Sequence, residues 1–321
     1  MQVLDSNPGA NARKLVVLGT GGTIAGLAPQ AGDSQAYQAA QVGVAQLLAG
    51  LDAPAGLELL VEQVAQIDSK DMDGAVWQRL AQRCADWLAR TDVHGIVITH
   101  GTDTLEETAY LLQAVLAPAK PVVLTCAMRP ANAAMPDGPQ NLRDALVVAA
   151  SAGVRGVLAV CAGTVHAADE VRKVHSYRLD AFGSGDAGPL AYVEAGMLRQ
   201  LRRWPQAPCD AAVLARLPAL AQDWPRVEIV TSHAGAGAGI VDALVRDGVQ
   251  GLVVAATGGG SVHHVLEQAL LRAQAAGVHV VRASRCDQGR VLAAAAQSLP
   301  DAGALSPVKA RIRLQLDLLA A

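Results

Sequence analysis

LVVLGTGGT at 15–23 and IVITHGTDT at 96–104 are the two stretches that decide the expected fold. Each begins with an apolar, largely β-branched run that favours a buried strand, and each continues into a turn rich in glycine and threonine. Open α/β sheets bind ligands at the carboxyl ends of their strands. The sequence therefore predicts that both hydroxyl-bearing turns lie at a ligand-binding edge, with the charge of Asp103 beside Thr102.

The composition is that of a globular α/β protein. The chain has 321 residues, enough for one large domain or two ordinary ones, with 51% hydrophobic and 17% charged residues. A net charge of −3 argues against a broad basic surface for nucleic acid. The cysteines are odd in number, widely spaced and free of CxxC pairs, which favours buried or incidental thiols in a reducing cytoplasm over a disulfide framework. They are Cys84, Cys126, Cys161, Cys209 and Cys286.

Neither a leader nor a membrane span is predicted. Residues 1–14 are polar and lack the basic start and apolar run of a secretory signal. No stretch reaches the ~18 uninterrupted apolar residues of a membrane helix. We therefore expect a cytoplasmic protein that does not bind membranes.

Expected strands and helices alternate along the chain, which predicts right-handed βαβ units and a parallel sheet. Between about 191 and 225 the periodicity weakens and prolines accumulate, so we interpret this stretch as a connection between domains. A second α/β pattern follows it. In the first pattern we expect strands at 15–18, 57–63, 95–99, 122–126 and 157–161 and helices at 42–48, 73–89, 105–116 and 142–151. In the second pattern we expect strands at 227–231, 251–256 and 278–283 and helices at 240–246, 262–275 and 307–319.

Each turn also has an ordinary structural explanation. The first lacks the third glycine of a dinucleotide fingerprint, because Ile24 stands there, and no GK[ST] follows, which excludes a P-loop. Taken alone, this stretch is better explained as a tight strand-to-helix turn that needs glycine than as a functional loop. In the second turn, Thr104 and Glu107 fit a capping box. That leaves His100, Thr102 and Asp103 unexplained at a place where a ligand would bind. Of these, Asp103 also has an ordinary interpretation, because an aspartate before a helix is more often a cap.

Three further polar residues are ambiguous when taken singly. Lys173 ends the polar run DEVRK, where a solvated surface lysine is the usual interpretation, and Tyr37 is a single tyrosine in a loop. Ser69 lies in DSKDM at 68–72, which fits a turn and helix cap. Zinc is disfavoured because there is no HExxH and because His263 and His264 are adjacent, so that their side chains diverge on a helix.

Taken together, several fragments resemble the bacterial L-asparaginases in order and spacing. The resemblance extends from residue 14 to about 315, and the two glycine–threonine motifs are its most specific part. The matching fragments are TGGTIAG at 20–26, DM at 71–72, ITHGTDT at 98–104, EETAY at 106–110, AMRP at 127–130, DGP at 137–139 and NL at 141–142.

The resemblance implies a catalytic set of five residues. Thr23 is expected to attack the side-chain amide of asparagine, with Tyr37 oriented near it, and Thr102, Lys173 and Asp103 are expected to form a triad. Threonine and lysine side chains are chemically suited to these roles. A threonine hydroxyl is a weak nucleophile that needs a nearby base, and a lysine amine can supply one once it is neutral. General-base help contributes roughly 10²–10⁴-fold.

The resemblance also implies the substrate contacts. Ser69 and Asp103 are expected to hold the α-carboxylate and α-ammonium ends of the amino acid, and Ala127 is expected to offer its backbone near the amide. Lys70 stands where the family usually carries Gln or Glu facing the ammonium. An inward-facing Lys70 would repel that group and weaken binding, whereas it could also turn to solvent or favour another substrate.

Two other departures concern the outer part of the site. Gly259 and Ser261 stand where many members of the family have asparagines. After residue 285 we find no clear match for the acidic residue that a neighbouring subunit often supplies near Tyr37. The resemblance thus implies an intact catalytic core with an altered specificity shell.

By resemblance we expect an N-terminal catalytic α/β domain at 1–200, a linker at 201–225 and a smaller C-terminal α/β domain at 226–321. The first is expected to carry a flavodoxin-like parallel sheet with helices on both faces, and the second to be Rossmann-like and to complete a neighbour's site. The expected assembly is a homotetramer, a dimer of dimers, that acts on a small amino acid without a metal or organic cofactor. The alternatives are a broader asparaginase–glutaminase, a non-hydrolytic amino-acid-binding protein, or an amidotransferase subunit, which would need an added RNA-binding domain.

Overall fold

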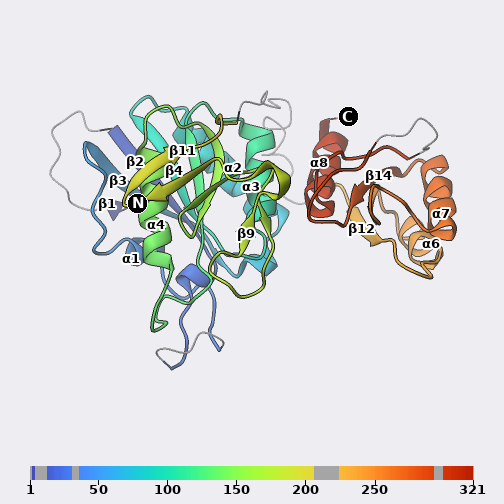
Figure 1. Ribbon diagram of the computed structural model, residues 1–321, viewed down its shortest axis with the longest axis horizontal. Helices are drawn as coiled ribbons and strands as arrows, with labels where there is room; N and C mark the ends of the chain where they lie inside the picture. The colour runs from blue at the N-terminus through green and yellow to red at the C-terminus, as the bar shows by residue number, and fades with distance from the viewer. Residues whose placement is uncertain (1, 4–12, 31–35, 206–223, 293–298, 321) are drawn as a thin grey trace. The chain divides into compact units, whose positions relative to one another are not determined.

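The computed structural model describes residues 2–3, 13–30, 36–205, 224–292 and 299–320. The chain divides into two compact units, 1–221 and 222–321, each with its own α/β arrangement (Figure 1). Most of the predicted linker, residues 206–223, lies outside the described residues. No described helix is long and apolar enough to cross a membrane.

The N-terminal unit is built on a nine-stranded sheet in the order β1-β3-β2-β4-β5-β6-β7-β10-β11. The five strands from β3 to β6 run parallel, as their apolar sequences predict, and the strands at both edges are antiparallel. The parallel strands are β2 (Arg13–Gly21), β3 (Leu57–Ile67), β4 (Val93–Thr99), β5 (Pro121–Thr125) and β6 (Gly156–Cys161). The edge strands are β1 (Gln2–Val3), β7 (Thr164–Ala167), β10 (Ala191–Glu194) and β11 (Met197–Gln200).

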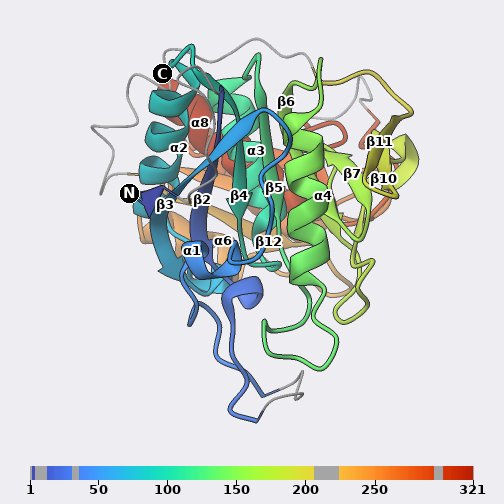
Figure 2. The ribbon, with the colours of Figure 1, turned by 90° about the vertical axis from the view of Figure 1, so that its left-hand side faces the viewer.

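Helices cover both faces of this sheet. On one face, α1 (Val44–Leu47) and α4 (Gly138–Ala150) pack on Leu15 and Val17, and Figure 2 shows α4 in front of the central strands. Side chains alternate along a strand, so the intervening residues Val16 and Leu18, which are also buried, face the other side. There α2 (Gly74–Leu88) and α3 (Leu105–Leu116) pack against the sheet and each other. The sheet is therefore buried on both faces, and the ends of its strands are the places where polar side chains can form a site.

Two antiparallel hairpins extend the sheet, and the second of them lies where the sequence predicted a connection between domains from about 191. Strands β10 and β11 pair around Ala195-Gly196, and β6 and β7 pair around Ala162-Gly163. All four turn residues have positive φ, as a two-residue hairpin turn of type I′ requires. Alanine in the first turn position replaces the usual Asn or Asp, which is why the sequence pattern did not reveal these turns.

A shorter hairpin lies outside the nine-stranded sheet. Strand β8 (Arg172–Lys173) pairs antiparallel with β9 (Phe182–Gly183), with Lys173 opposite Phe182. These two-residue strands were not predicted, because segments so short carry no periodicity in the sequence.

The C-terminal unit is a three-stranded parallel sheet in the order β12-β13-β14. Helices α6 and α7 share one apolar cluster with it, and α8 packs in a second cluster against Val227, Val253 and Ala283. The elements are β12 (Val227–Thr231), α6 (Gly239–Arg246), β13 (Gly251–Ala256), α7 (His264–Ala275), β14 (His279–Ser284) and α8 (Pro307–Ala320), all within two residues of the predicted bounds.

Candidate active site

The two glycine–threonine turns meet at the carboxyl edge of the parallel sheet. Strands β2 and β4 are neighbours, with Gly19 opposite Thr99, so their turns emerge side by side. Gly22, at φ +81°, lies directly against Gly101: a Cβ on Gly22 would stand 2.2 Å from the Gly101 Cα. Thr23 and Thr102 each follow one of these two glycines, so the contact brings together two threonine-bearing turns that are far apart in sequence.

Thr23 and Tyr37 form the first polar pair of the site. Thr23 opens a short 3-10 turn, Thr23–Ala25, is buried, and has its Oγ1 2.9 Å from the Tyr37 hydroxyl. The intervening loop is closed at its base by Leu27 and Gln38, whose N–H and carbonyl groups bond reciprocally at 2.9 Å. This closure places Tyr37 over the turn that carries Thr23.

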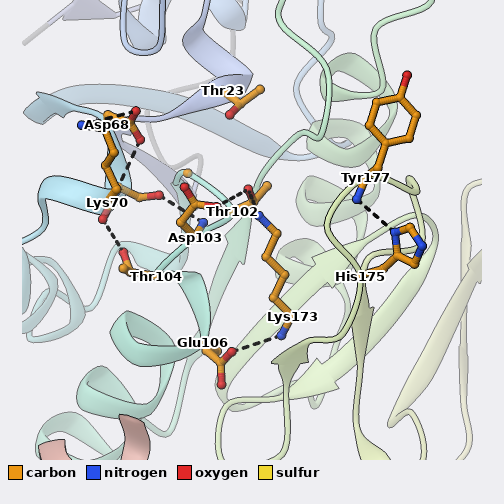
Figure 3. A network of polar contacts seen from close by, with 12 residues as sticks. Thr23, Asp68, Lys70, Thr102, Asp103, Thr104, Glu106, Lys173, His175 and Tyr177 are labelled. Carbon is orange, nitrogen blue, oxygen red and sulfur yellow. Dashed lines mark hydrogen bonds and ion pairs between the residues drawn. The ribbon is translucent and has the colours of Figure 1, made fainter. Parts of the chain in front are cut away.

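Lys173 joins the second turn from 70 residues away in sequence. Its Nζ donates to Thr102 Oγ1 at 2.8 Å and to Asp103 Oδ1 at 2.6 Å (Figure 3). Its backbone N–H donates to Glu106 Oε1 at 3.1 Å, which ties β8 to the first turn of α3. The Lys173 side chain is only 20% exposed, so the interpretation as a solvated surface lysine is wrong. Sequence reasoning missed Glu106, which reads simply as a helix N-terminal acid.

Ser69 supports the second turn from the end of β3. Ser69 is buried in the 3-10 turn Ser69–Asp71, and its Oγ accepts the Asp103 N–H at 3.2 Å. Thr104 Oγ1 donates to the Ser69 carbonyl at 2.8 Å. Thr104 makes no side-chain cap to α3, so its predicted part in a capping box is wrong, because its hydroxyl is committed to this cross-link.

Lys70 turns toward neighbouring acids at the surface. Its ammonium pairs with Asp71 and lies 3.9 Å from Asp68 Oδ2, and the side chain is 61% exposed. The pKa of Lys70 is raised, first by the hydrogen bond to Asp71 and further by the charges of Asp71, Asp68 and Asp103. Lys70 thus remains a cation whose charge is largely balanced by its own turn.

His100 is part of the core of the second turn and does not face a ligand. It is fully buried, and its Nδ1 donates to the Gly101 carbonyl at 2.8 Å. Its Nε2 then accepts from Thr108 Oγ1 at 2.9 Å, and that hydroxyl in turn accepts the Trp77 indole N–H at 2.9 Å. Burial lowers the pKa of His100 to about 4, so the ring is neutral at pH 7.

Ala127 closes the site from β5. It is fully buried and packs with Ile24, Ala25 and Val42 of the first turn. The loop that follows is tied to the same turn by Asn132, whose side-chain amide bonds both the N–H and the carbonyl of Ala28 at 2.8 Å. Sequence reasoning missed Asn132, since an asparagine in a loop carries no local signal of such a distant partner.

The C-terminal unit carries the two positions that depart from the family pattern. Gly259 lies in the exposed turn after β13, and Ser261 N–H donates to the Thr257 carbonyl at 2.9 Å. Among the described residues, no group of three or more His, Cys, Asp or Glu side chains is arranged to hold a metal ion.

Comparisons with known proteins cover nearly the whole chain. Residues 14–206 match the model of the family "Asparaginase, N-terminal", and residues 226–320 match the model of the "Glutaminase/Asparaginase C-terminal domain". The L-asparaginase 2 of Escherichia coli (strain K12) is 37% identical over 320 residues, which cover 95% of this chain and 88% of that protein.

Two further relatives show the range of names in the family. The glutaminase-asparaginase of Pseudomonas fluorescens biotype A is 36% identical over 312 residues, covering 93% of this chain and 84% of that protein. The crystal structure of a probable cytoplasmic L-asparaginase from Campylobacter jejuni superposes with a TM-score of 0.88 at 35% identity, covering 95% of each chain.

Proposed function

This chain belongs to the asparaginase family, and we propose that it hydrolyses the side-chain amide of L-asparagine to aspartate and ammonia with Thr23 as the nucleophile. The observation that supports the proposal is the contact of Gly22 with Gly101, because the turn that carries Thr23 packs there against the turn whose Thr102 hydroxyl is hydrogen-bonded to Lys173. A threonine nucleophile needs groups nearby that move protons. The Tyr37 hydroxyl, 2.9 Å from Thr23 Oγ1, is assigned to acylation, and Lys173 at the adjoining turn is assigned to deacylation.

In the acylation step, Thr23 Oγ1 attacks the carboxamide carbon and loses its proton. The hydroxyl of Tyr37, 2.9 Å away, receives or relays that proton, which ends on the departing ammonia. Backbone N–H groups of the first turn are suited to stabilise the oxyanion, at about 3 kcal/mol per donor. The products of this step are ammonia and a β-aspartyl ester on Thr23.

In the deacylation step, a water molecule attacks that ester. Thr102 and Lys173 form the proton path, because Nζ lies 2.8 Å from Thr102 Oγ1 and its amine takes up the water proton in its neutral form. Asp103 Oδ1, 2.6 Å from Nζ, stabilises the resulting ammonium. As the ester C–O bond breaks, the Lys173 ammonium returns that proton to Thr23 Oγ1 by way of the Thr102 hydroxyl, so aspartate leaves and both the Thr23 hydroxyl and the neutral amine are restored.

The substrate's charged end is assigned to Asp103 and Ser69. Asp103 is 53% exposed, and among the described residues only its Oδ1 has hydrogen-bond partners, so Oδ2 is available to an α-ammonium. Ser69 Oγ lies beside it and can donate to the α-carboxylate while it accepts the Asp103 N–H. Ala127 offers its backbone to the carboxamide. Lys70 lies at the rim of this region.

We also infer the setting of the enzyme from the family and the cysteines. Four cysteines, Cys84, Cys126, Cys161 and Cys286, form no disulfide, which fits the reducing cytoplasm, and one relative is named as a probable cytoplasmic L-asparaginase. The proposed assembly is a homotetramer that needs no metal or organic cofactor. Exposed apolar side chains on the segment after Lys173, Val174 and Tyr177, support an interface near the site. Light scattering of the purified chain tests the oligomer.

Ammonia release by the purified chain tests the reaction. We expect turnover of asparagine, and the ratio of asparagine to glutamine turnover then places the chain between relatives named L-asparaginase and those named glutaminase-asparaginase. Thr23→Ala should abolish release while retaining the fold. Binding of asparagine without turnover by the wild type would favour the non-hydrolytic alternative, and full activity of Thr23→Ala would refute the nucleophile.

A further inference from the structure

The aspartate that precedes α4 does not behave as a helix cap. Asp137 occupies the N-cap position of α4, where a carboxylate normally accepts N–H groups of the helix's own first turn. It makes no such bond. Instead, Oδ2 accepts the Met128 N–H at 2.9 Å and Oδ1 accepts the Arg129 N–H at 3.0 Å. Both acceptor oxygens are thus committed to the loop that follows Ala127.

Asn141, one turn into α4, holds the other side of Ala127. Its Nδ2 donates to the Cys126 carbonyl at 2.9 Å and to Asp137 Oδ2 at 3.3 Å, and its Oδ1 accepts the Ala162 N–H at 3.0 Å. The residue is buried, so these bonds replace bonds to water. Residues on both sides of Ala127 are therefore fixed by side chains of one helix.

Ala127 itself has unused hydrogen-bonding capacity. Within the part of the chain that the structure describes, neither its N–H nor its carbonyl oxygen has a hydrogen-bond partner, although the residue is fully buried. Buried backbone groups are nearly always paired, so this pair of groups calls for a ligand. A carboxamide, which both donates and accepts, complements them.

The direction of the Ala127 carbonyl is set by Asp137. The Ala127 carbonyl and the Met128 N–H belong to one planar trans peptide group and point in opposite directions. A carboxylate that fixes the N–H on one side therefore fixes the carbonyl on the other. By the same geometry, Asn141, through the Cys126 carbonyl, fixes the direction of the Ala127 N–H.

We propose that Asp137 is a positioning residue that aims the Ala127 carbonyl at the N–H of the substrate's carboxamide, with Asn141 as its partner. The inference rests on the proposed function and adds the residues that orient its amide-binding group. Packing reinforces the alignment, because a Cβ on Gly138, the first residue of α4, would lie 3.0 Å from Ile24 Cγ1 and 3.5 Å from the Ala127 Cβ. The start of α4 thus fits between the turn that carries Thr23 and Ala127.

The test compares an amide with an ester in Asp137→Asn, a variant of nearly the same shape that retains one acceptor oxygen. The β-methyl ester of aspartate offers no N–H to the Ala127 carbonyl, so its hydrolysis does not use the contact. We expect kcat for asparagine to fall about 10- to 100-fold, as for a misaligned catalytic contact, while kcat for the ester falls less than about threefold. KM for asparagine should change little, because Ser69 and Asp103 hold the other end of the substrate.

The matched control is Asp144→Asn, the same substitution on the same helix. Asp144 is buried and accepts from Gln140 Nε2 at 2.8 Å, whereas the helix bonds residues 126–129 through Asp137 and Asn141. The amide-to-ester ratio of Asp144→Asn should therefore equal that of the wild type. An equal fall of amide and ester turnover in Asp137→Asn, or no fall at all, overturns the proposal. If Asp137→Asn does not fold, Asp137→Glu, which keeps both acceptor oxygens, must show the same selective loss in smaller measure. Failure of the wild type to release ammonia from asparagine would instead refute the proposed function.

Discussion

Replacing Lys173 by methionine separates the chemical role of its amine from its structural role. Methionine keeps most of the length and apolar stem of lysine but cannot carry a proton. The variant loses two hydrogen bonds, 2.8 Å to Thr102 Oγ1 and 2.6 Å to Asp103 Oδ1. If the amine moves the proton in deacylation, kcat should fall by the roughly 10²–10⁴-fold that general-base catalysis contributes.

The effect on stability should be small by comparison. Asp103 is 53% exposed, so water replaces the ammonium as its partner, and an ion pair at such a site contributes at most about 1 kcal/mol. Lys14→Met is the matched control, because Lys14 pairs with Asp92 at 2.9 Å with a similar exposure of 26% and lies outside the site. Both variants should therefore unfold at similar denaturant concentrations.

The assay is steady-state ammonia release from asparagine, measured beside a urea unfolding curve for both variants. We expect near-normal kcat for Lys14→Met and a loss of at least about 100-fold for Lys173→Met. A Lys173→Met variant that kept more than about a tenth of the wild-type kcat, or that lost activity only in proportion to its loss of folded protein, would refute a role of the amine in proton transfer.

Four other predictions follow from the site. Tyr37→Phe removes the hydroxyl 2.9 Å from Thr23 and should lower kcat by about 10- to 100-fold with little change in melting temperature; unchanged kcat would contradict a role in proton transfer. Gly22→Ala should lower the free energy of unfolding in urea by about 3 kcal/mol or more, since the added Cβ would stand 2.2 Å from the Gly101 Cα. Gly50 also has a positive φ but has open space around it, so Gly50→Ala should lower the free energy of unfolding by only about 1 kcal/mol. In the folded protein the pKa of His100 is lowered to about 4 from an ordinary 6.5, so between these pH values only the unfolded chain binds a proton at this histidine. The free energy of unfolding should therefore fall by up to about 3 kcal/mol as the pH drops from 6.5 to 4. Unfolding of His100→Gln, measured over the same pH range, should lack that part of the pH dependence. Lys70→Gln removes a cation near Asp103 and should lower KM for asparagine by about two- to threefold, an effect that high salt should abolish; a raised KM would show that Lys70 assists binding.

The order of strands and helices could be predicted from the sequence because local signals agree with the tertiary fold. Apolar runs such as 15–18 and 96–98 are buried on both faces of a parallel sheet, and their glycine turns end the strands where the pattern changes. The β10–β11 hairpin escaped because Ala195 adopts a positive φ that alanine rarely takes. There the pairing of β10 with β11 overrides the preference of alanine for a negative φ.

The site was harder to predict because its contacts are remote in sequence. The composition around Lys173 indicates solvent exposure, and only the β8–β9 hairpin and Glu106 bring its amine to Thr102. His100 illustrates the opposite case, since its place in a ligand-binding motif suggests exposure while its ring is buried on Thr108. The strand ends alone indicated the two threonine turns and Asp103, whereas Tyr37, Ser69 and Lys173 were indicated only by the family resemblance.

The identity of the acylated residue tests the central claim most directly. Wild-type enzyme turning over asparagine is quenched in acid, digested, and analysed by mass spectrometry for a peptide that carries one aspartyl group. We predict the group on Thr23, and none on the corresponding peptide of Thr23→Ala. An aspartyl group on Thr102 instead, or full turnover by Thr23→Ala, would contradict the account.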